Sequence, residues 1–256
     1  KRRYSPDVSV WDWLRFGGGI LALVATSILL LRLHGVALRW LPFTAVLRAA
    51  MQLAAISVLL SGVNQWPWLV LGFIALMLST ASWTGASRAE VLPDGRRNAV
   101  ISVVVGGTSS LFLTLLVGLI SPTPQHVVAI AGSVIGNSMS IVTLTSRRIW
   151  AALDAHRGEV EGWLALGATP SRATTWLRRN AVRESLLPNL DQTRNTGLVT
   201  LPGAFIGALF GGANPVGAAM FQLTMLSAIL VSAAVTGTLF STLSGRSPVL
   251  PAPQES

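Results

Sequence analysis

Polar side chains that stand inside long apolar segments are the residues of this sequence with the chemistry to contact a polar solute. Around 127–146, a Gly136-Asn137 pair is followed by Ser138 and Ser140, and an amide near the middle of a membrane needs a hydrogen-bonding partner or water. Such groups act either as hydrogen bonds between packed helices or as contacts along a solute pathway. The candidate pathway residues are Arg48, Gln52, Gly136, Asn137, Ser138, Ser140, Pro202, Gly203 and Gln222.

Spacing and proline chemistry single out three of these candidates. Arg48 and Gln52 are four residues apart, so they share one face of a helix. Arg48 stands near a segment end, from which its guanidinium can reach the water interface. Pro202 lacks an amide donor and must interrupt a helix. Irregular backbone within a membrane is tolerated where it is buried in protein or lines a cavity, so this break is either a simple kink or part of a hinge or cavity.

Catalytic and tight metal-binding chemistry has little support. The chain has no cysteine, and His34, His126 and His156 fall in loops or at segment ends without the spacing of metal ligands. Methionine is more often a packing residue than a soft metal ligand; the methionines considered are Met139, Met220 and Met225. We expect no catalytic residue and no metal site. A transported metal would make transient oxygen contacts or travel as a complex.

The sequence also lacks the common energy sources of a transporter. All ten acidic residues lie outside the apolar segments, whereas carriers driven by ion gradients usually keep an ionisable residue near the mid-membrane. No GxxxxGK[ST] phosphate-binding loop is present. We therefore expect no cofactor in this chain, and a transporter with neither energy source needs a separate one.

A polar segment at 147–194 predicts two helices joined by a tight turn. Helix is favoured from about 148 to 166, and Gly167 suits the left-handed position that ends a helix. Thr169-Pro170 then predicts an N-cap and the first position of a second helix, which we expect to end at Pro188. The apolar face of this second helix is expected to hold Ala173, Trp176, Leu177, Ala181 and Leu187, flanked by Arg172, Arg178, Arg179 and Arg183. Such a hairpin either rests on the lipid surface or docks on a soluble partner.

Three stretches of the sequence, in this order, resemble the FetB-like family of ABC transporter permeases. They read AGSVIGNSMSIVTLTSRR at 131–148, EVEGWLALGATPSRA at 159–173 and TGLVTLPGAFIGALFGGANPVGAAMFQ at 196–222. Members of this family are membrane subunits associated with iron export in bacteria, and plant relatives are linked to aluminium tolerance. The resemblance implies a homodimer of this chain bound to two copies of a separate ABC ATPase.

The same resemblance gives the hairpin a role in coupling to the ATPase. Glu161 stands six residues before Gly167, which is the spacing of Glu and Gly in the EAA loop of ABC permeases, although Leu187-Pro188 comes later than in that loop. The implied ATPase-coupling residues are Glu159, Glu161, Trp163, Leu164, Leu166, Gly167, Ala168, Thr169, Pro170 and Arg172.

Membrane-spanning helices must position all of these residues. The chain is 51% hydrophobic and only 11% charged, with a mean hydropathy of +0.59, whereas soluble domains are about 25% charged. Backbone groups in lipid must bond within their own segment, so the fold class is all-α integral membrane protein. The chain is expected to form a single permease domain over 1–256, with a cytoplasmic coupling hairpin at 147–195. Seven spans are predicted at about 17–38, 42–62, 66–84, 98–120, 127–146, 197–213 and 216–240.

Arginine placement predicts the orientation of these spans. Eight arginines of 147–194 and those of the other loops on that side mark the cytoplasmic face, while the three opposite loops have none. We expect the N-terminus outside, the C-terminus inside, and a multi-pass protein of the cell inner (plasma) membrane. The net charge of +9 suits contact with anionic lipid headgroups, and no soluble basic surface favours nucleic acid.

The function that we expect is a permease subunit that exports iron or another metal with ATP hydrolysed on a separate chain. One alternative is an ABC permease of another substrate or direction, such as a lipid or a sugar nucleotide. Another is a membrane scaffold that transports nothing and whose hairpin only docks a partner. An integral membrane enzyme is the least favoured class, because the spans hold no acid–base pair.

Overall fold

The computed structural model describes residues 10–36, 38, 40–63 and 68–246, and their regular structure is helical apart from one isolated bridge between Thr196 and Thr200. The prediction of an all-α membrane protein is confirmed. The chain divides into two compact units, residues 1–65 and 66–256, which we describe separately. The helices are α1 (Val10–Leu33), α2 (Leu41–Val63), α3 (Leu69–Arg88), α4 (Gly95–Leu116), α5 (Pro124–Ala155), α6 (Arg157–Ala165), α7 (Pro170–Ala173), α8 (Thr175–Asn195), α9 (Gly203–Phe210) and α10 (Pro215–Ser244).

The first unit is a pair of apolar helices, α1 and α2. The described side chains of both helices are mostly exposed, which suits helices whose surroundings are lipid. Near the start of α2, the guanidinium carbon of Arg32 lies 5.9 Å from the ring centroid of Trp40, a cation–π contact at the junction of the two helices. Arg48 and Gln52 lie on α2 with exposed side chains.

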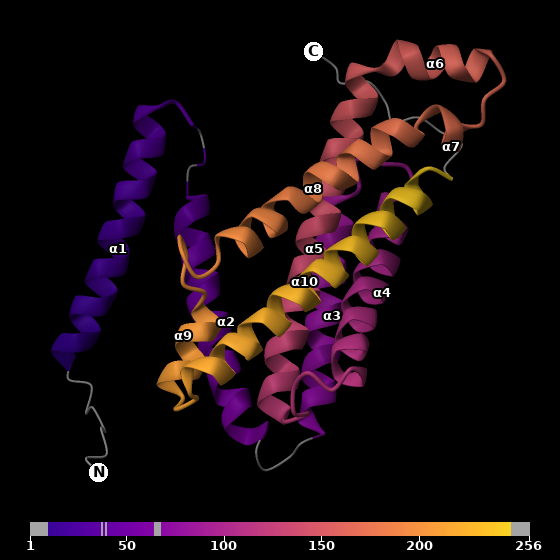
Figure 1. Ribbon diagram of the computed structural model, residues 1–256. Coiled ribbons are helices and arrows are strands. Elements are labelled where there is room, and N and C mark those ends of the chain that lie inside the picture. The colour runs from indigo at the N-terminus through magenta and orange to yellow at the C-terminus, as the bar shows by residue number, and fades with distance from the viewer. Residues whose placement is uncertain (1–9, 37, 39, 64–67, 247–256) are drawn as a thin grey trace. The chain divides into compact units, whose positions relative to one another are not determined.

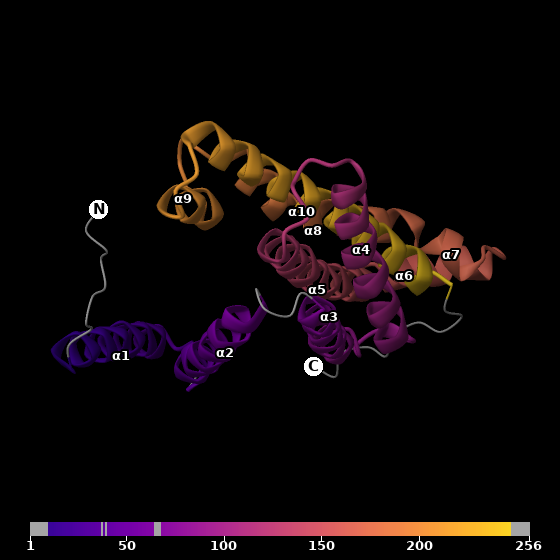
Figure 2. The same ribbon diagram turned by 90° about the horizontal axis from the view of Figure 1, so that it is seen from below.

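The second unit is built around α4, α5 and α10, which pack against one another. The helix α3 packs on α4 and α5, while α8 lies across α5 and α10 (Figures 1 and 2). The close approach of α4 and α10 requires Gly106, because a Cβ at this position would overlap the Thr236 hydroxyl. Fully buried Val103, Val134 and Phe240 belong to the core of this unit.

Six of the seven predicted spans correspond to long helices, and the segment 197–213 does not. Its helix, α9, has eight residues, or about 12 Å at 1.5 Å per residue, whereas a crossing needs about 30 Å. The helix of this segment is therefore too short to cross the membrane by itself. The predicted interruption is confirmed, because Pro202 is the N-cap of α9 and no helix forms over 196–202.

The second arm of the hairpin is longer than the sequence predicted. The short α7 ends at Ala173, and after Thr174 the chain continues as α8 to Asn195 with Pro188 inside the helix. The prediction that Pro188 ends this helix is wrong. Proline removes one amide donor, but Ser185 and Asn189, on either side of it, both hydrogen-bond to α5. These tertiary contacts outweigh the local preference.

Candidate functional site

The turn between α6 and α7 is closed by backbone hydrogen bonds that depend on a glycine. Gly167 has a φ of +85°, in the left-handed region that side chains with a Cβ disfavour. Its amide donates to the carbonyl of Leu164 at 2.9 Å, and the amide of Ala168 donates to the carbonyl of Trp163 at 3.0 Å. This pair of bonds is a Schellman motif, so the end of α6 is fixed as the sequence predicted.

The start of α7 and the base of α6 complete a stiff hairpin. The Thr169 side-chain oxygen accepts the amide of Arg172 at 3.4 Å, and Pro170 occupies the first helical turn, as predicted from the Thr-Pro pair. Val160 on α6 is 1% exposed and joins the core of the second unit. The first arm of the hairpin is therefore anchored in the core at Val160, and the chain turns sharply at the tip.

An open groove of about 1010 Å³ is lined by residues of α6, of α7 and of the first turns of α8. Six of the predicted coupling residues line it: Glu159, Trp163, Leu166, Gly167, Ala168 and Arg172. Further lining residues are Ala173, Thr175, Trp176, Arg179, Asn180 and Arg183. The other predicted coupling residues, Glu161, Leu164, Thr169 and Pro170, belong to the same hairpin but do not line the groove.

The groove combines aromatic surface with positive charge. Trp163, Leu166 and Trp176 are 51%, 83% and 44% exposed, and three arginines and one glutamate also line the groove. Exposed aromatic and arginine side chains are enriched where proteins bind one another. Trp176 and Leu187, which the sequence predicts on the apolar face of the second helix, both have exposed side chains.

Arg178 ties this hairpin to the end of α10. Its Nη1 donates to the carbonyl of Ser241 at 2.6 Å, and its Nη2 donates to the carbonyl of Ser171 at 2.9 Å. Its Nε donates to the Thr174 hydroxyl at 3.1 Å. Gly245 leaves room for this arrangement, because a Cβ there would overlap the guanidinium. One buried side chain thus joins α7, α8 and the last turn of α10.

The charge of Arg178 suits this position at the end of a helix. The side chain is buried without a carboxylate among the partners given by the structure, and carbonyls at a helix C-terminus carry partial negative charge. Burial, together with the neighbouring charge of Arg179, lowers the pKa of Arg178, but a guanidinium stays protonated in proteins.

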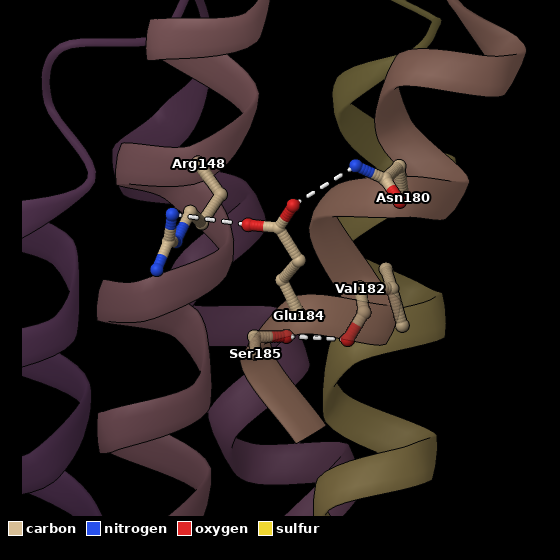
Figure 3. A network of polar contacts seen from close by, with 5 residues as sticks. All are labelled: Arg148, Asn180, Val182, Glu184 and Ser185. Atoms are coloured by element: carbon tan, nitrogen blue, oxygen red, sulfur yellow. Dashed lines mark hydrogen bonds and ion pairs between the residues drawn. The ribbon is translucent and has the colours of Figure 1, made fainter. Parts of the chain in front are cut away.

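Glu184 connects α8 to α5 near the same end of the molecule. Figure 3 shows its two carboxylate oxygens accepting from Arg148 on α5 at 3.0 Å and from Asn180 on α8 at 3.0 Å. The next residue, Ser185, is buried and donates to the carbonyl of Val182. The Ser185 hydroxyl also accepts from Thr145 on α5 at 2.9 Å.

Asn137 is the polar centre of the interface between α5, α8 and α10. Its Nδ2 donates to the carbonyl of Ile229 and to the hydroxyl of Ser232, each at 3.1 Å. Its Oδ1 accepts from Nδ2 of Asn189 on α8 at 2.9 Å. Protein groups satisfy both ends of this amide, as expected if Asn137 forms hydrogen bonds between packed helices.

The remaining pathway candidates of the second unit lie in different surroundings. Ser138 is fully buried and accepts from Thr236 on α10 at 3.0 Å. Ser140 is exposed and donates to the carbonyl of Gly136, one turn earlier. Gln222 is buried, and its Oε1 has no hydrogen-bond partner in the part of the chain that the structure describes.

The histidines are as dispersed as the sequence suggested. His126 lies near Ser121 at the start of α5, whereas His156 is at the base of α6, with its ring 4.9 Å from that of Trp176. Among the described residues, no group of three or more His, Cys, Asp or Glu side chains is arranged to hold a metal ion.

Arg178 and Asn189 are the two residues whose roles the sequence reading missed. Arg178 was expected on the flank of the second helix, and Asn189 was expected beyond its end. A signal for Asn189 was present in the spacing: Ala181, Ser185 and Asn189 recur every four residues, and this period continues one face of a helix.

Comparison with known proteins identifies relatives along most of the chain. Residues 18–248 match the family model described as "Uncharacterised protein family (UPF0014)". The chain is 30% identical over 239 residues to the UPF0014 membrane protein STAR2 of Oryza sativa subsp. japonica, covering 90% of this chain and 83% of that protein. It is 34% identical over 201 residues to the protein ALUMINUM SENSITIVE 3 of Arabidopsis thaliana, covering 77% and 73%.

A bacterial relative has a name that states a transport role. The chain is 31% identical over 173 residues to the probable iron export permease protein FetB of Escherichia coli (strain K12), covering 68% of this chain and 66% of that protein. No solved structure matches the chain.

Proposed function

The chain belongs to the UPF0014 family, and we propose that it exports iron or another metal as the membrane-embedded permease subunit of an ABC transporter. The cargo class is supported by the relative named as a probable iron export permease and, more loosely, by the one named for aluminium sensitivity. The multi-pass architecture follows from five helices, among the described residues, that are long and apolar enough to cross a membrane.

The observation that carries the coupling role is a rigid hairpin connected directly to a membrane helix. Its tip presents the groove of α6–α8, and Arg178 joins its base to the end of α10. When an ATPase bound in this groove moves, the hairpin and α10 must move together. Rigid elements that shift as a body are a common way to convert a local event into a global transition.

The proposed assembly is a homodimer of this chain with two copies of the ATPase, in the cell inner (plasma) membrane. ATP and magnesium bind to the ATPase, and this chain supplies the gate. The copy number and the membrane are those implied by the resemblance to bacterial ABC permeases.

Affinity purification of the tagged chain in detergent tests this function. We expect a stoichiometric ATPase to co-purify, and reconstituted vesicles to move Fe²⁺ only when ATP is hydrolysed. Arg179→Glu should reduce recovery of the ATPase because it reverses a charge that lines the groove. Arg147→Glu makes the same charge change outside the groove and should not.

Three results would contradict parts of this proposal. Equal recovery of the ATPase by both variants would remove the groove as its docking site. Transport by the purified chain on an ion gradient alone would remove the ATPase as the energy source. ATP hydrolysis without movement of any metal would favour a scaffold.

A further inference from the structure

The C-terminal part of α8 lies beside the middle of two membrane helices. The amide of Asn189 is hydrogen-bonded to Asn137, and Asn137 is hydrogen-bonded to Ile229. Asn137 is the fourteenth of 32 residues in α5, and Ile229 is the fifteenth of 30 residues in α10. Both helices are long and apolar enough to span a bilayer. This chain of hydrogen bonds places Asn189 near the mid-membrane.

Charged side chains follow Asn189 within about one and a half helical turns. Asp191 and Arg194 are both exposed, and neither forms an ion pair with another residue in the described ranges. The sequence places every acidic residue outside the predicted spans, whereas the contacts of Asn189 bring Asp191 close to the depth of the middle of α5 and α10. Ionisable groups at this depth face a bundle interior or water rather than lipid.

The backbone after α8 gives a second reason to expect water here. Residues 196–202 form no helix, and Gly197 has a φ of +94°. Non-helical backbone at membrane depth is tolerated only where protein buries it or where it lines a water-filled cavity. Interrupted helices near the midplane also form cargo sites in many transporters.

We propose that the end of α8 and the 196–202 segment line a water-filled passage, in which the Asp191 carboxylate contacts a hydrated metal cation. Carboxylate and amide oxygens are suitable ligands for hard cations, and Gln192 and Asn195 add exposed amides on the same turn. Arg194 places a positive charge nearby, which weakens retention of the cation and favours its release. The choice of a metal cation rests on the proposed function; the presence of water does not.

Cysteine labelling tests for water directly, because the chain contains no cysteine of its own. Asp191→Cys is compared with Glu90→Cys, in the exposed α3–α4 connection, and with Phe112→Cys, on α4, where the side chain is 67% exposed in an apolar helix. Membrane vesicles of both orientations receive a membrane-impermeant maleimide. Because maleimide reacts with the thiolate, which needs water, Asp191→Cys should react within about tenfold of the rate of Glu90→Cys from at least one side.

The labelling rates show whether water reaches position 191. Phe112→Cys should react far more slowly, since lipid surrounds it. If Asp191→Cys reacts as slowly as Phe112→Cys, the passage is overturned. The passage is also overturned if Asp191→Cys forms a disulfide between two copies and is not labelled, because a second chain would then cover this face. Neither readout needs ATP or transport, so this result is independent of the proposed function.

Transport by charge variants tests the contact with the cation. With the ATPase present, Asp191→Asn should lower ATP-driven movement of Fe²⁺ at least several-fold while ATPase recovery stays unchanged, and Asp191→Glu should restore part of it. Unchanged transport by Asp191→Asn would overturn the cation contact. If the wild-type protein moves no Fe²⁺, the proposed cargo fails, while the labelling result still decides whether the passage exists.

Discussion

Individual buried and half-buried polar side chains connect the helices of the second unit. Arg178 and Asn137 each hydrogen-bond to residues on two further helices or helix ends. Buried polar groups of this kind cost little while they are fully satisfied, but removing one partner leaves the others desolvated and unpaired. Their loss should therefore alter coupling or stability more than the loss of exposed charges.

Arg178→Leu should separate ATPase docking from metal transport. The change removes the charged donor to the carbonyls of Ser241 and Ser171, and a hydrogen bond from a charged group contributes about 1.5–3 kcal/mol. The groove keeps its lining, so the ATPase should still bind, but fewer metal ions should move per ATP hydrolysed. The measurements are thermal unfolding in detergent and the ratio of transport to hydrolysis in vesicles.

Two further variants control for this interpretation. Arg147→Leu removes an exposed arginine from α5 and should leave both measurements near wild type. Gly245→Ala introduces a Cβ where the guanidinium lies and should reproduce the uncoupling without removing any charge. Normal coupling in both Arg178→Leu and Gly245→Ala would show that this contact is only structural.

Asn137 and Asn189 should show energetic coupling in a double-mutant cycle. Their side chains share a hydrogen bond of 2.9 Å. The loss of unfolding free energy in the double variant should therefore differ by about 0.5–3 kcal/mol from the sum of the losses in Asn137→Ala and Asn189→Ala. Denaturant unfolding in detergent measures this difference. Asn180→Ala, which removes an exposed amide bound to Glu184, should add independently to Asn137→Ala. Additive effects of Asn137→Ala and Asn189→Ala would contradict the hydrogen bond between these two side chains.

At the scale of whole elements, local signals in the sequence predicted the helices well and their packing poorly. Long apolar runs predicted six of the helices, and Gly167 and Thr169 predicted the hairpin turn, because such signals act within a few residues. The extension of α8 past Pro188 could not be predicted in the same way. It depends on the contact of Asn189 with a residue 52 positions earlier in the chain, which local pattern does not encode.

The glycines of the packed helices illustrate the same limit. Gly132 and Gly136 have the spacing of a GxxxG motif, which permits close approach of helices. A Cβ on Gly132 would meet the Met77 side chain at 2.8 Å, but one on Gly136 would have nothing within 4 Å. The tightest approach is instead at Gly106 of α4, against Thr236 of α10. Spacing identifies glycines that permit close contact, but only the arrangement of helices selects those that are used.

Gly106→Val should force α4 and α10 apart. A side chain at this position overlaps Thr236 and approaches the Ser232 carbonyl, and overpacking of this kind costs about 1–3 kcal/mol or more. We expect a lower yield of folded protein and a lower unfolding temperature in detergent. Gly136→Val, on the neighbouring helix with open space around its Cβ, is the matched control. Equal stability of the two variants would be inconsistent with this packing.

At the scale of the whole molecule, the proposed function makes the protein a gate that is moved from one end. The polar contacts made by Arg178, Glu184, Ser185 and Asn189 run along α8 from the hairpin to the middle of α5. A movement of the hairpin is therefore carried to the same depth at which Asp191 and the interrupted backbone lie. Docking of the ATPase and opening of the passage are linked by one helix, α8, rather than by a chain of separate elements.

Docking of the ATPase should weaken as the salt concentration rises. Three arginines line the groove, and raising the ionic strength from about 0.1 M to about 1 M shortens the Debye length from about 10 Å to about 3 Å. We expect the Kd measured in nanodiscs of uncharged lipid, which exclude headgroup attraction, to rise by about tenfold over this range, a change equivalent to 1.4 kcal/mol. Arg179→Glu should show a smaller salt dependence, and Arg147→Glu should keep that of the wild type. A Kd independent of salt would mean that the aromatic and leucine side chains of the groove alone hold the ATPase.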